Sequence, residues 1–212
     1  MADVKLYLSG AAAGYVPATI RGAWDITTQA STFKCSTTRD GAGSPNGQYR
    51  YAYNTNADND VLAFRSISIP LSAVELSGVW TGCLGIYESN AAMNAQVHIY
   101  AYVTTGDSDT PRGTLINTYI DADEVSVAAA TGGEGLGGTG SAVSVSLNDR
   151  ICIEIGYRAN AASIYACYVY TGGSNGTDLS DGENATLYPG WFSFAESSGL
   201  SSGGMPIFFD LS

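Results

Sequence analysis

The chain contains a single histidine, His98, in 212 residues. A Ser-His-Asp triad or a histidine-based zinc site would have to be built around this residue alone, and the lack of a second histidine removes most metal-hydrolase schemes. His98 also lies among tyrosines in the middle of a predicted strand. We therefore predict that the protein is not an enzyme, that no residue is catalytic, and that His98 is hydrogen-bonded to its neighbours.

Basic residues are scarce as well. Lys and Arg number 9 against 20 Asp and Glu, which gives a formal net charge of -11. Binding to nucleic-acid backbones depends on Lys and Arg that replace counterions, and no basic cluster is present. No window approaches the roughly 20 apolar residues that span a bilayer, and the N-terminus lacks a basic segment followed by an apolar run. We expect synthesis in the cytoplasm, with neither nucleic acid nor membrane as a partner.

The four cysteines lack the CxxC spacing of zinc sites. Cys152 and Cys167 fall in consecutive predicted strands and could face one another, but a reducing cytoplasm favours free, buried thiols.

Acidic residues cluster in turns without the EF-hand pattern, so we predict solvated acids, no metal and no cofactor. Two carboxylates could also serve a hydrolase of the glycosidase kind, a hypothesis that ranks below the two functions given at the end of this section. The distance between the two carboxyl groups decides that chemistry, and it is not readable from sequence. The acidic clusters are Asp58 and Asp60; Asp107 and Asp109; Asp121, Asp123 and Glu124; and Asp178, Asp181 and Glu183.

No long helical pattern is present, whereas 26 Gly and 14 Tyr residues suit short strands and tight turns. The stretch Cys83–Thr105 contains two strand-like runs joined by a polar, alanine-rich connection. Its second half alternates aliphatic residues with aromatic and polar ones, which is the period of a strand with two different faces. Counting similar segments gives about ten strands with frequent turn signals. We predict an all-β fold, a two-sheet antiparallel sandwich of jelly-roll type.

The length favours one domain over residues 1–212. Apart from a strand over Val4–Leu8 and a short one at Trp24–Ile26, residues 1–60 are poorly patterned and predict an N-terminal arm or a surface layer. Residues 121–140 are small and glycine-rich, which predicts a loop. A last strand is expected over 205–212.

Four motifs follow one another along the chain: LGIYESNAAMNAQVHIYAYV at 84–103, RGTLI at 112–116, DRICIEIGYRA at 149–159 and PGWFSF at 189–194. In this order, over about residues 58–196, they resemble a family of small structural proteins of tailed bacteriophages. In that family an ESNAAANA-like connection joins two strands, and RGTL-like and DGDRI-like turns and a PxWIEF-like strand follow. Asn148, where the family tends to have glycine, and Gly190 before Trp191 are departures at turns.

The resemblance implies a non-enzymatic virion component that acts through contacts with other virion proteins, as a capsid decoration, neck or tail accessory protein. Acidic charge favours an outward position, because a lumenal protein would face packaged DNA and be repelled. The alternative is a carbohydrate-binding module that aids attachment to a bacterial surface.

Five tyrosines bear on both interpretations. They would place flat rings with polar tips on a sheet, as a sugar-binding surface does, but such rings also recur at subunit interfaces, which is the more economical explanation. The possible interface or sugar-facing residues are Tyr100, Tyr102, Tyr165, Tyr168 and Tyr170.

The amino-acid composition also predicts that several copies of this chain associate. With few charges and many Tyr, Ala and Gly residues, a monomer would present wide, weakly polar surface, which usually marks an interface. We expect a homo-oligomer or a repeated lattice subunit; analogy with other particle-surface jelly rolls suggests a trimer.

Overall fold

The computed structural model describes residues 3–27, 31–39, 47–53, 57–160 and 163–197, with the backbone alone for 47–53. Twelve strands and two short 3-10 helices make up the regular structure of this described part, so the fold is all-β, as predicted. The elements are β1 (Asp3–Ala12), β2 (Ser31–Ser36), β3 (Gly47–Tyr53), β4 (Asn59–Ile67), β5 (Val74–Glu88), η1 (Ala91–Met93), β6 (Gln96–Thr104), β7 (Pro111–Ile120), η2 (Ala129–Thr131), β8 (Gly133–Thr139), β9 (Val143–Val145), β10 (Arg150–Ala159), β11 (Tyr165–Thr171) and β12 (Trp191–Glu196).

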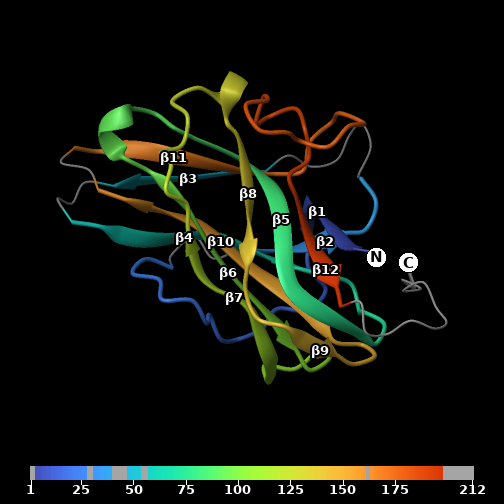
Figure 1. Cartoon of the computed structure of the whole chain (residues 1–212). Helices are drawn as coiled ribbons and strands as arrows, with labels where there is room; N and C mark the ends of the chain where they lie inside the picture. The colour runs from blue at the N-terminus through green and yellow to red at the C-terminus, as the bar shows by residue number, and fades with distance from the viewer. Residues whose placement is uncertain (1–2, 28–30, 40–46, 54–56, 161–162, 198–212) are drawn as a thin grey trace.

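The strands form two layers that enclose one core (Figure 1). One layer has the order β4-β10-β6-β7, and the other has the order β3-β11-β5-β12-β1-β2. The layers join where β2 pairs in parallel with β4, whereas the other pairings between the described strands are antiparallel. Side chains from both layers, such as Leu6 of β1 and Ile153 of β10, meet in the buried core. The prediction of a jelly-roll-like sandwich is confirmed.

The long strand β5 organises its layer. One of its edges pairs with β11 and β12, and the other pairs with β8 and β9. Gly78 has a φ of +86°, which glycine adopts without strain. A Cβ added at Gly85 would lie 2.6 Å from the carbonyl oxygen of Ala185, so the neighbouring backbone requires glycine there. These glycines let one continuous strand curve and pack against four neighbours (Figure 1).

A buried carboxylate fastens the segment 13–27 across the outer face of the β4-β10-β6-β7 layer. Glu154, in the middle of β10, is fully buried. It accepts hydrogen bonds from the backbone N–H groups of Arg21 (2.8 Å) and Gly22 (2.7 Å) and from the indole Nε1 of Trp24 (2.7 Å). A carboxylate that accepts three N–H groups remains satisfied when it is removed from water. The segment therefore covers a sheet face that would otherwise meet solvent.

Further contacts bind the same segment to the sheet. Arg65 of β4, only 5% exposed, donates from Nη1 to the carbonyl oxygen of Pro17 at 2.6 Å. Tyr102 of β6 is fully buried, and its hydroxyl donates to the carbonyl oxygen of Thr19 at 3.4 Å. As a result, β4, β10 and β6 are buried on both faces along most of their length.

The sequence predicted an N-terminal arm or a surface layer over residues 1–60, and the described part of this range divides in two: β1 and β2 are strands of the sandwich, whereas residues 13–27 lie as a layer on the outer face of β4, β10 and β6. β1 lies between β12 and β2, and it contains the strand predicted over Val4–Leu8. The strand expected at Trp24–Ile26 is only a single bridge between Ile26 and Val61. Residues 13–27 are poorly patterned in sequence because much of their attachment to the sheet uses backbone donors and acceptors instead of aliphatic side chains.

A second correction concerns residues 121–140. Their last part is the strand β8, which pairs with β5 from Val79 to Gly85. The many glycines of this stretch predicted a loop, but the close backbone around the strand leaves no room for a Cβ at some of these positions. A Cβ at Gly133 would overlap the carbonyl oxygen of Ser180. The strand predicted over 205–212 lies outside the described residues.

Gly156 of β10 provides a test of this packing. A Cβ at this position would overlap the carbonyl oxygen of Val61 and lie 2.7 Å from Trp24 Cζ3. We expect Gly156→Ala to lower the free energy of unfolding by about 3 kcal/mol, because the crowding comes partly from backbone that cannot rotate away. Urea unfolding followed by circular dichroism measures the change. Gly14→Ala is the control, since a Cβ there meets no atom within 4 Å; equal stability of the two variants would contradict the packing described here.

Candidate functional site

The chain itself covers Tyr102 of β6 fully and Tyr100 in part. Tyr102 lies under the N-terminal segment, with the guanidinium of Arg21 5.3 Å from its ring centroid. Tyr100 is partly buried, its ring centroid lies 5.9 Å from that of Tyr102, and its hydroxyl is 3.3 Å from Thr114 Oγ1. Tyr102 is therefore a buried packing residue with no exposed ring face to offer a partner.

The predicted tyrosines of β11 lie in the other layer. Tyr165 packs against the core. Tyr168 and Tyr170 lie beside Tyr87 of β5, with centroid distances of 4.6 and 6.0 Å and interplanar angles of 12° and 17°. Offset stacks of this kind stabilise paired strands by about 0.5–1.5 kcal/mol. The structure thus does not bring the five predicted tyrosines together on one surface, and a role for Tyr168 in an interface remains a prediction.

His98 occupies a polar cluster on the covered face. Its side chain is fully buried, its ring centroid lies 4.2 Å from that of Trp24, and its Nδ1 lies 3.1 Å from Asp60 Oδ1. Burial lowers the pKa of His98, although the neighbouring Asp60 opposes this shift. Asp60 also accepts two hydrogen bonds from Arg158, at 2.9 and 2.8 Å. Neither ring nitrogen of His98 makes a hydrogen bond with a described residue, so the prediction that His98 is hydrogen-bonded to its neighbours is wrong. The imidazole is held by burial and by packing on Trp24 of the N-terminal segment.

The first motif builds the connection between β5 and β6. Glu88, fully buried at the end of β5, accepts a hydrogen bond from the backbone N–H of Ala95 at 2.9 Å. The Asn90 side chain caps η1 by accepting from Ala92 N at 2.9 Å, and Asn94 ends that helix with a left-handed φ of +49°. Asparagine is one of the few residues that suit both positions. The ESNAAMNA motif therefore encodes a reversal of the chain.

The acidity of Glu88 is strongly perturbed. Burial, and next the neighbouring carboxyl group of Glu124, raise the pKa of Glu88 to about 8, so the Glu88 carboxyl group is protonated at neutral pH. Its Oε1 has no hydrogen-bond partner among the described residues. Sequence reasoning missed this residue, although a glutamate that directly follows the apolar run of β5 was a signal.

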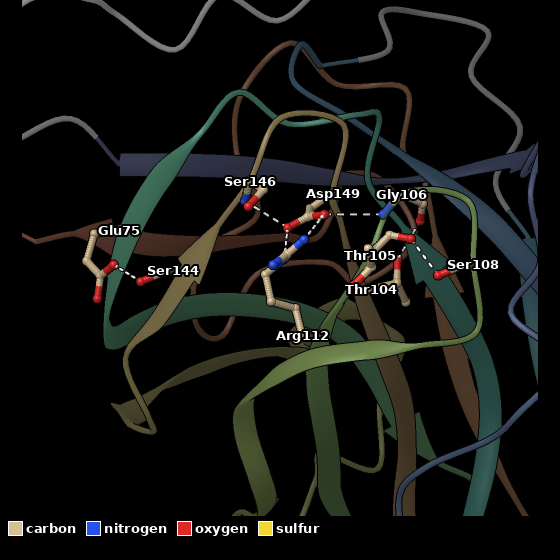
Figure 2. A network of polar contacts seen from close by, with 9 residues as sticks. All are labelled: Glu75, Thr104, Thr105, Gly106, Ser108, Arg112, Ser144, Ser146 and Asp149. Carbon is tan, nitrogen blue, oxygen red and sulfur yellow. Dashed lines mark hydrogen bonds and ion pairs between the residues drawn. The ribbon is translucent and has the colours of Figure 1, made fainter.

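The second and third motifs meet at one buried carboxylate, Asp149, which is 1% exposed (Figure 2). It accepts hydrogen bonds from the guanidinium group of Arg112, from the backbone N–H of Gly106 at 3.2 Å and from that of Ser146 at 2.7 Å. Figure 2 shows Arg112 reaching from β7 to the turn that precedes β10. The preceding residue, Asn148, has a φ of +70°, which explains why glycine or asparagine suits this position.

The fourth motif is anchored in the same manner. The indole Nε1 of Trp191, at the start of β12, donates to the carbonyl oxygen of Leu179 at 2.9 Å. The Nζ of Lys5 lies 3.8 Å from the Trp191 ring centroid and 2.6 Å from Asp178 Oδ2. Burial would raise the pKa of Asp178, but hydrogen bonds from Lys5 and Arg39 outweigh it and lower the pKa. These contacts join the loop before β12 to β1.

Several acidic residues of the clusters that the sequence analysis named have partners in the chain. Asp107 pairs with Arg150, and Asp109 accepts hydrogen bonds from the backbone N–H and the hydroxyl of Thr19. No group of three or more His, Cys, Asp or Glu side chains within the described ranges is placed to hold a metal ion. Nor does any helix of that part reach the length and apolarity needed to cross a membrane.

All four cysteines are buried and free, so Cys152 and Cys167 form no disulfide. They lie on β10 and β11, in different layers of the sandwich. Burial raises the pKa of every one of the four thiols, which keeps them protonated and unreactive.

Comparisons with known proteins add little. No family model matches the chain, and no curated protein matches it. Among solved structures it is similar to a chain described as "Structure of infectious bursal disease virus Gx strain", with a TM-score of 0.28 and 14% sequence identity. The match covers 87% of this chain and 42% of that chain, so this chain spans less than half of its length. A similarity of this size carries no argument about fold or function.

The Glu88 carboxyl group predicts a specific pH dependence. Its pKa in the folded protein, about 8, exceeds the usual value of 4.5, so the folded state binds the proton more tightly than the unfolded state does. The resulting stability is complete below pH 4.5 and is lost as the pH rises through 8. We expect Glu88→Gln, which mimics the protonated form, to match the wild type in acid and to exceed it by roughly 2–4 kcal/mol above pH 8.

Urea unfolding at a series of pH values from 5 to 9 measures this difference. Glu124→Gln removes the charge of the partner and should reduce the pH dependence only in part, because burial is the larger cause. Parallel curves for the wild type and Glu88→Gln would contradict the raised pKa of Glu88.

Proposed function

We propose that this protein is a non-enzymatic structural component of a tailed bacteriophage particle. The observation that carries the proposal is the use of the motif residues. Asp149, Arg112, Glu88 and Trp191 are bound to each other or to backbone groups of the chain, at the ends of strands. Residues used in this way specify a rigid scaffold that presents surface, and they hold no reactive group toward a substrate.

Charge favours a position on the outside of such a particle. The chain carries a formal charge of -11, and the carboxylates of Asp149, Glu154 and Asp60 are bound to donors within the fold. The remaining acids lie mainly on loops. An acidic surface that faced packaged DNA would be repelled, whereas one on the exterior helps to keep particles apart in solution. A capsid decoration, neck protein or tail accessory protein all satisfy this constraint.

The test is the protein content of purified particles. We expect mass spectrometry of particles banded twice in a density gradient to detect this chain in a fixed ratio to the major capsid protein. An abundant cytosolic protein of the host serves as the control for contamination and should decline with each round of purification. Loss of the chain in parallel with that control would remove the proposal.

We also propose that the chain works as a homo-oligomer. Charged residues are only 14% of the chain, and several large apolar side chains are exposed at 42–69%. Association would bury such groups, at a gain of about 25 cal/mol per Å² of apolar surface. The exposed residues are Val16, Val79, Val127, Leu147, Ile164 and Leu187.

Light scattering coupled to size-exclusion chromatography tests this association. We expect a mass that is an integer multiple of 22.0 kDa, with a trimer as the specific expectation. Leu147→Asp and Ile164→Asp place a charge on the two most exposed of these side chains, and at least one should lower the mass. A mass of 22.0 kDa at every concentration up to the solubility limit would contradict the oligomer.

A further inference from the structure

A small pocket of about 290 Å³ opens between β7 and the end of β8. Both strands are edges among the described strands, since β7 pairs only with β6 and β8 pairs only with β5. They approach each other at one end, where the backbone N–H of Ser141 donates to the carbonyl oxygen of Leu115 at 3.0 Å. The pocket is lined mainly by Trp80, Asn117, Thr118, Tyr119, Thr139 and Ser141.

The floor contains a tryptophan whose N–H group lacks a partner. Trp80 is 2% exposed, packed edge-to-face on Tyr119 with ring centroids 4.9 Å apart. No described residue accepts a hydrogen bond from its indole Nε1, whereas Trp24 and Trp191 both donate theirs. This nitrogen is not among the fully enclosed, unpartnered atoms of the described residues, so it keeps some exposure to solvent. Tryptophan N–H groups at largely buried positions usually find an acceptor. A ligand in the pocket would supply the acceptor that the protein does not.

A glycine leaves this edge of the indole open. A Cβ at Gly138 would lie 3.4 Å from Trp80 Nε1 and 3.6 Å from its Cε2 and Cζ2 atoms. Any larger side chain would therefore extend over the part of the ring that meets the pocket. The neighbouring Gly137 points elsewhere, because a Cβ there would meet the Trp80 carbonyl oxygen and Thr81.

The rim is polar and uncharged. Asn117, Thr118, Thr139 and Ser141 are exposed, and their side chains make no hydrogen bond within the described part of the chain. No Asp, Glu, Lys or Arg lines the pocket, in a protein whose surface is strongly acidic. An uncharged rim of amide and hydroxyl groups over an aromatic floor suits a neutral polyol and offers nothing to a phosphate or a metal ion.

One rim residue is held in a strained conformation. Thr118 has a φ of +62°, which a β-branched side chain rarely adopts, at an irregularity in the pairing of β6 with β7. Strain of this kind persists where surrounding structure enforces it and is concentrated at binding sites. Here it turns an edge strand so that Asn117 and Thr118 both line the pocket.

We infer that this pocket binds a single neutral pyranose residue of a polysaccharide. The sugar hydroxyls pair with the Asn117 amide, the rim hydroxyls and the Trp80 indole N–H, while apolar C–H groups of the ring pack on Trp80 and Tyr119. The volume of about 290 Å³ lies just below the roughly 300–1,000 Å³ of pockets for drug-sized ligands, which suits a ligand of one ring. This site differs from the five tyrosines that the sequence suggested, and it goes beyond a role in the particle.

Saturation-transfer NMR with the full chain tests the inference. The probes are the methyl pyranosides of glucose, galactose, mannose, rhamnose and N-acetylglucosamine, each alone, followed by neutral bacterial polysaccharides. We expect transfer to at least one pyranoside and a change in tryptophan fluorescence on titration. Absence of transfer from all of the pyranosides and polysaccharides would overturn the proposal.

Two glycine variants locate the site. Gly138→Val covers the Trp80 edge and should abolish binding, whereas Gly137→Val on the opposite side of the same strand should leave binding unchanged. Asn117→Ala removes one hydrogen-bonding group from an exposed position and should weaken binding by about tenfold. It remains informative if Gly138→Val fails to fold. Unchanged binding in both Gly138→Val and Asn117→Ala would place the sugar elsewhere and refute this pocket.

Particle content separates this inference from the proposed function. Gly138→Val should still be incorporated into particles, because it changes no residue of the four motifs. Loss of sugar binding with normal incorporation supports both proposals. Sugar binding by a chain that is absent from particles would support the pocket alone.

Discussion

The carboxylate of Glu154 is the interaction on which much of this structure depends. It lies in the centre of a core strand and accepts three N–H groups from one segment of the chain. Removal of a carboxylate from water is costly unless donors replace the lost hydration, and here backbone groups and an indole do so. Because these donors belong to residues 21–24, satisfying the charge also fixes the N-terminal segment over the sheet. Both faces of β10 are buried as a consequence.

The same chemistry recurs at the chain reversals. Asp149 and Glu88 are both buried carboxyl groups that accept backbone N–H groups at the ends of strands. They differ in their neighbours: Asp149 faces the guanidinium of Arg112, whereas Glu88 faces another carboxyl group, Glu124. Loop conformation is thus set by specific acceptors, and the sandwich can hold long connections in defined positions. A protein that must present the same surface in many copies gains from such rigidity.

The acidic character of the chain has two separate roles. Some carboxylates are structural and have donors in the fold, as Glu154 and Asp178 do. Others remain at the surface and set the net charge of -11. The pocket between β7 and β8 belongs to neither class, since uncharged groups line it. A neutral ligand can therefore be selected on a surface that repels polyanions.

The sequence by itself determined the fold class. Alternation over residues 97–104 and 150–158 marks strands regardless of their partners, because a period of two is a local property of the extended chain. It also determined the turn chemistry: Asn94 and Asn148 occupy left-handed positions that few other residues tolerate. Motif order was readable, but the contact between Arg112 and Asp149 was not, since it joins residues 37 positions apart.

Tertiary structure alone decided which faces are covered. Nothing local to Tyr102 or His98 reveals that residues 13–27 lie over them, and so an aromatic face that appeared available is buried. The glycines of β8 read as a loop, because glycine weakens local strand preference, yet the free edge of β5 and the close backbone of Ser180 make a strand there. The pocket beside Trp80 likewise exists only because two edge strands distant in sequence approach each other and an irregularity turns Thr118 toward it. Contacts of this kind are set by the free energy of the whole packed chain, which no short stretch of sequence contains.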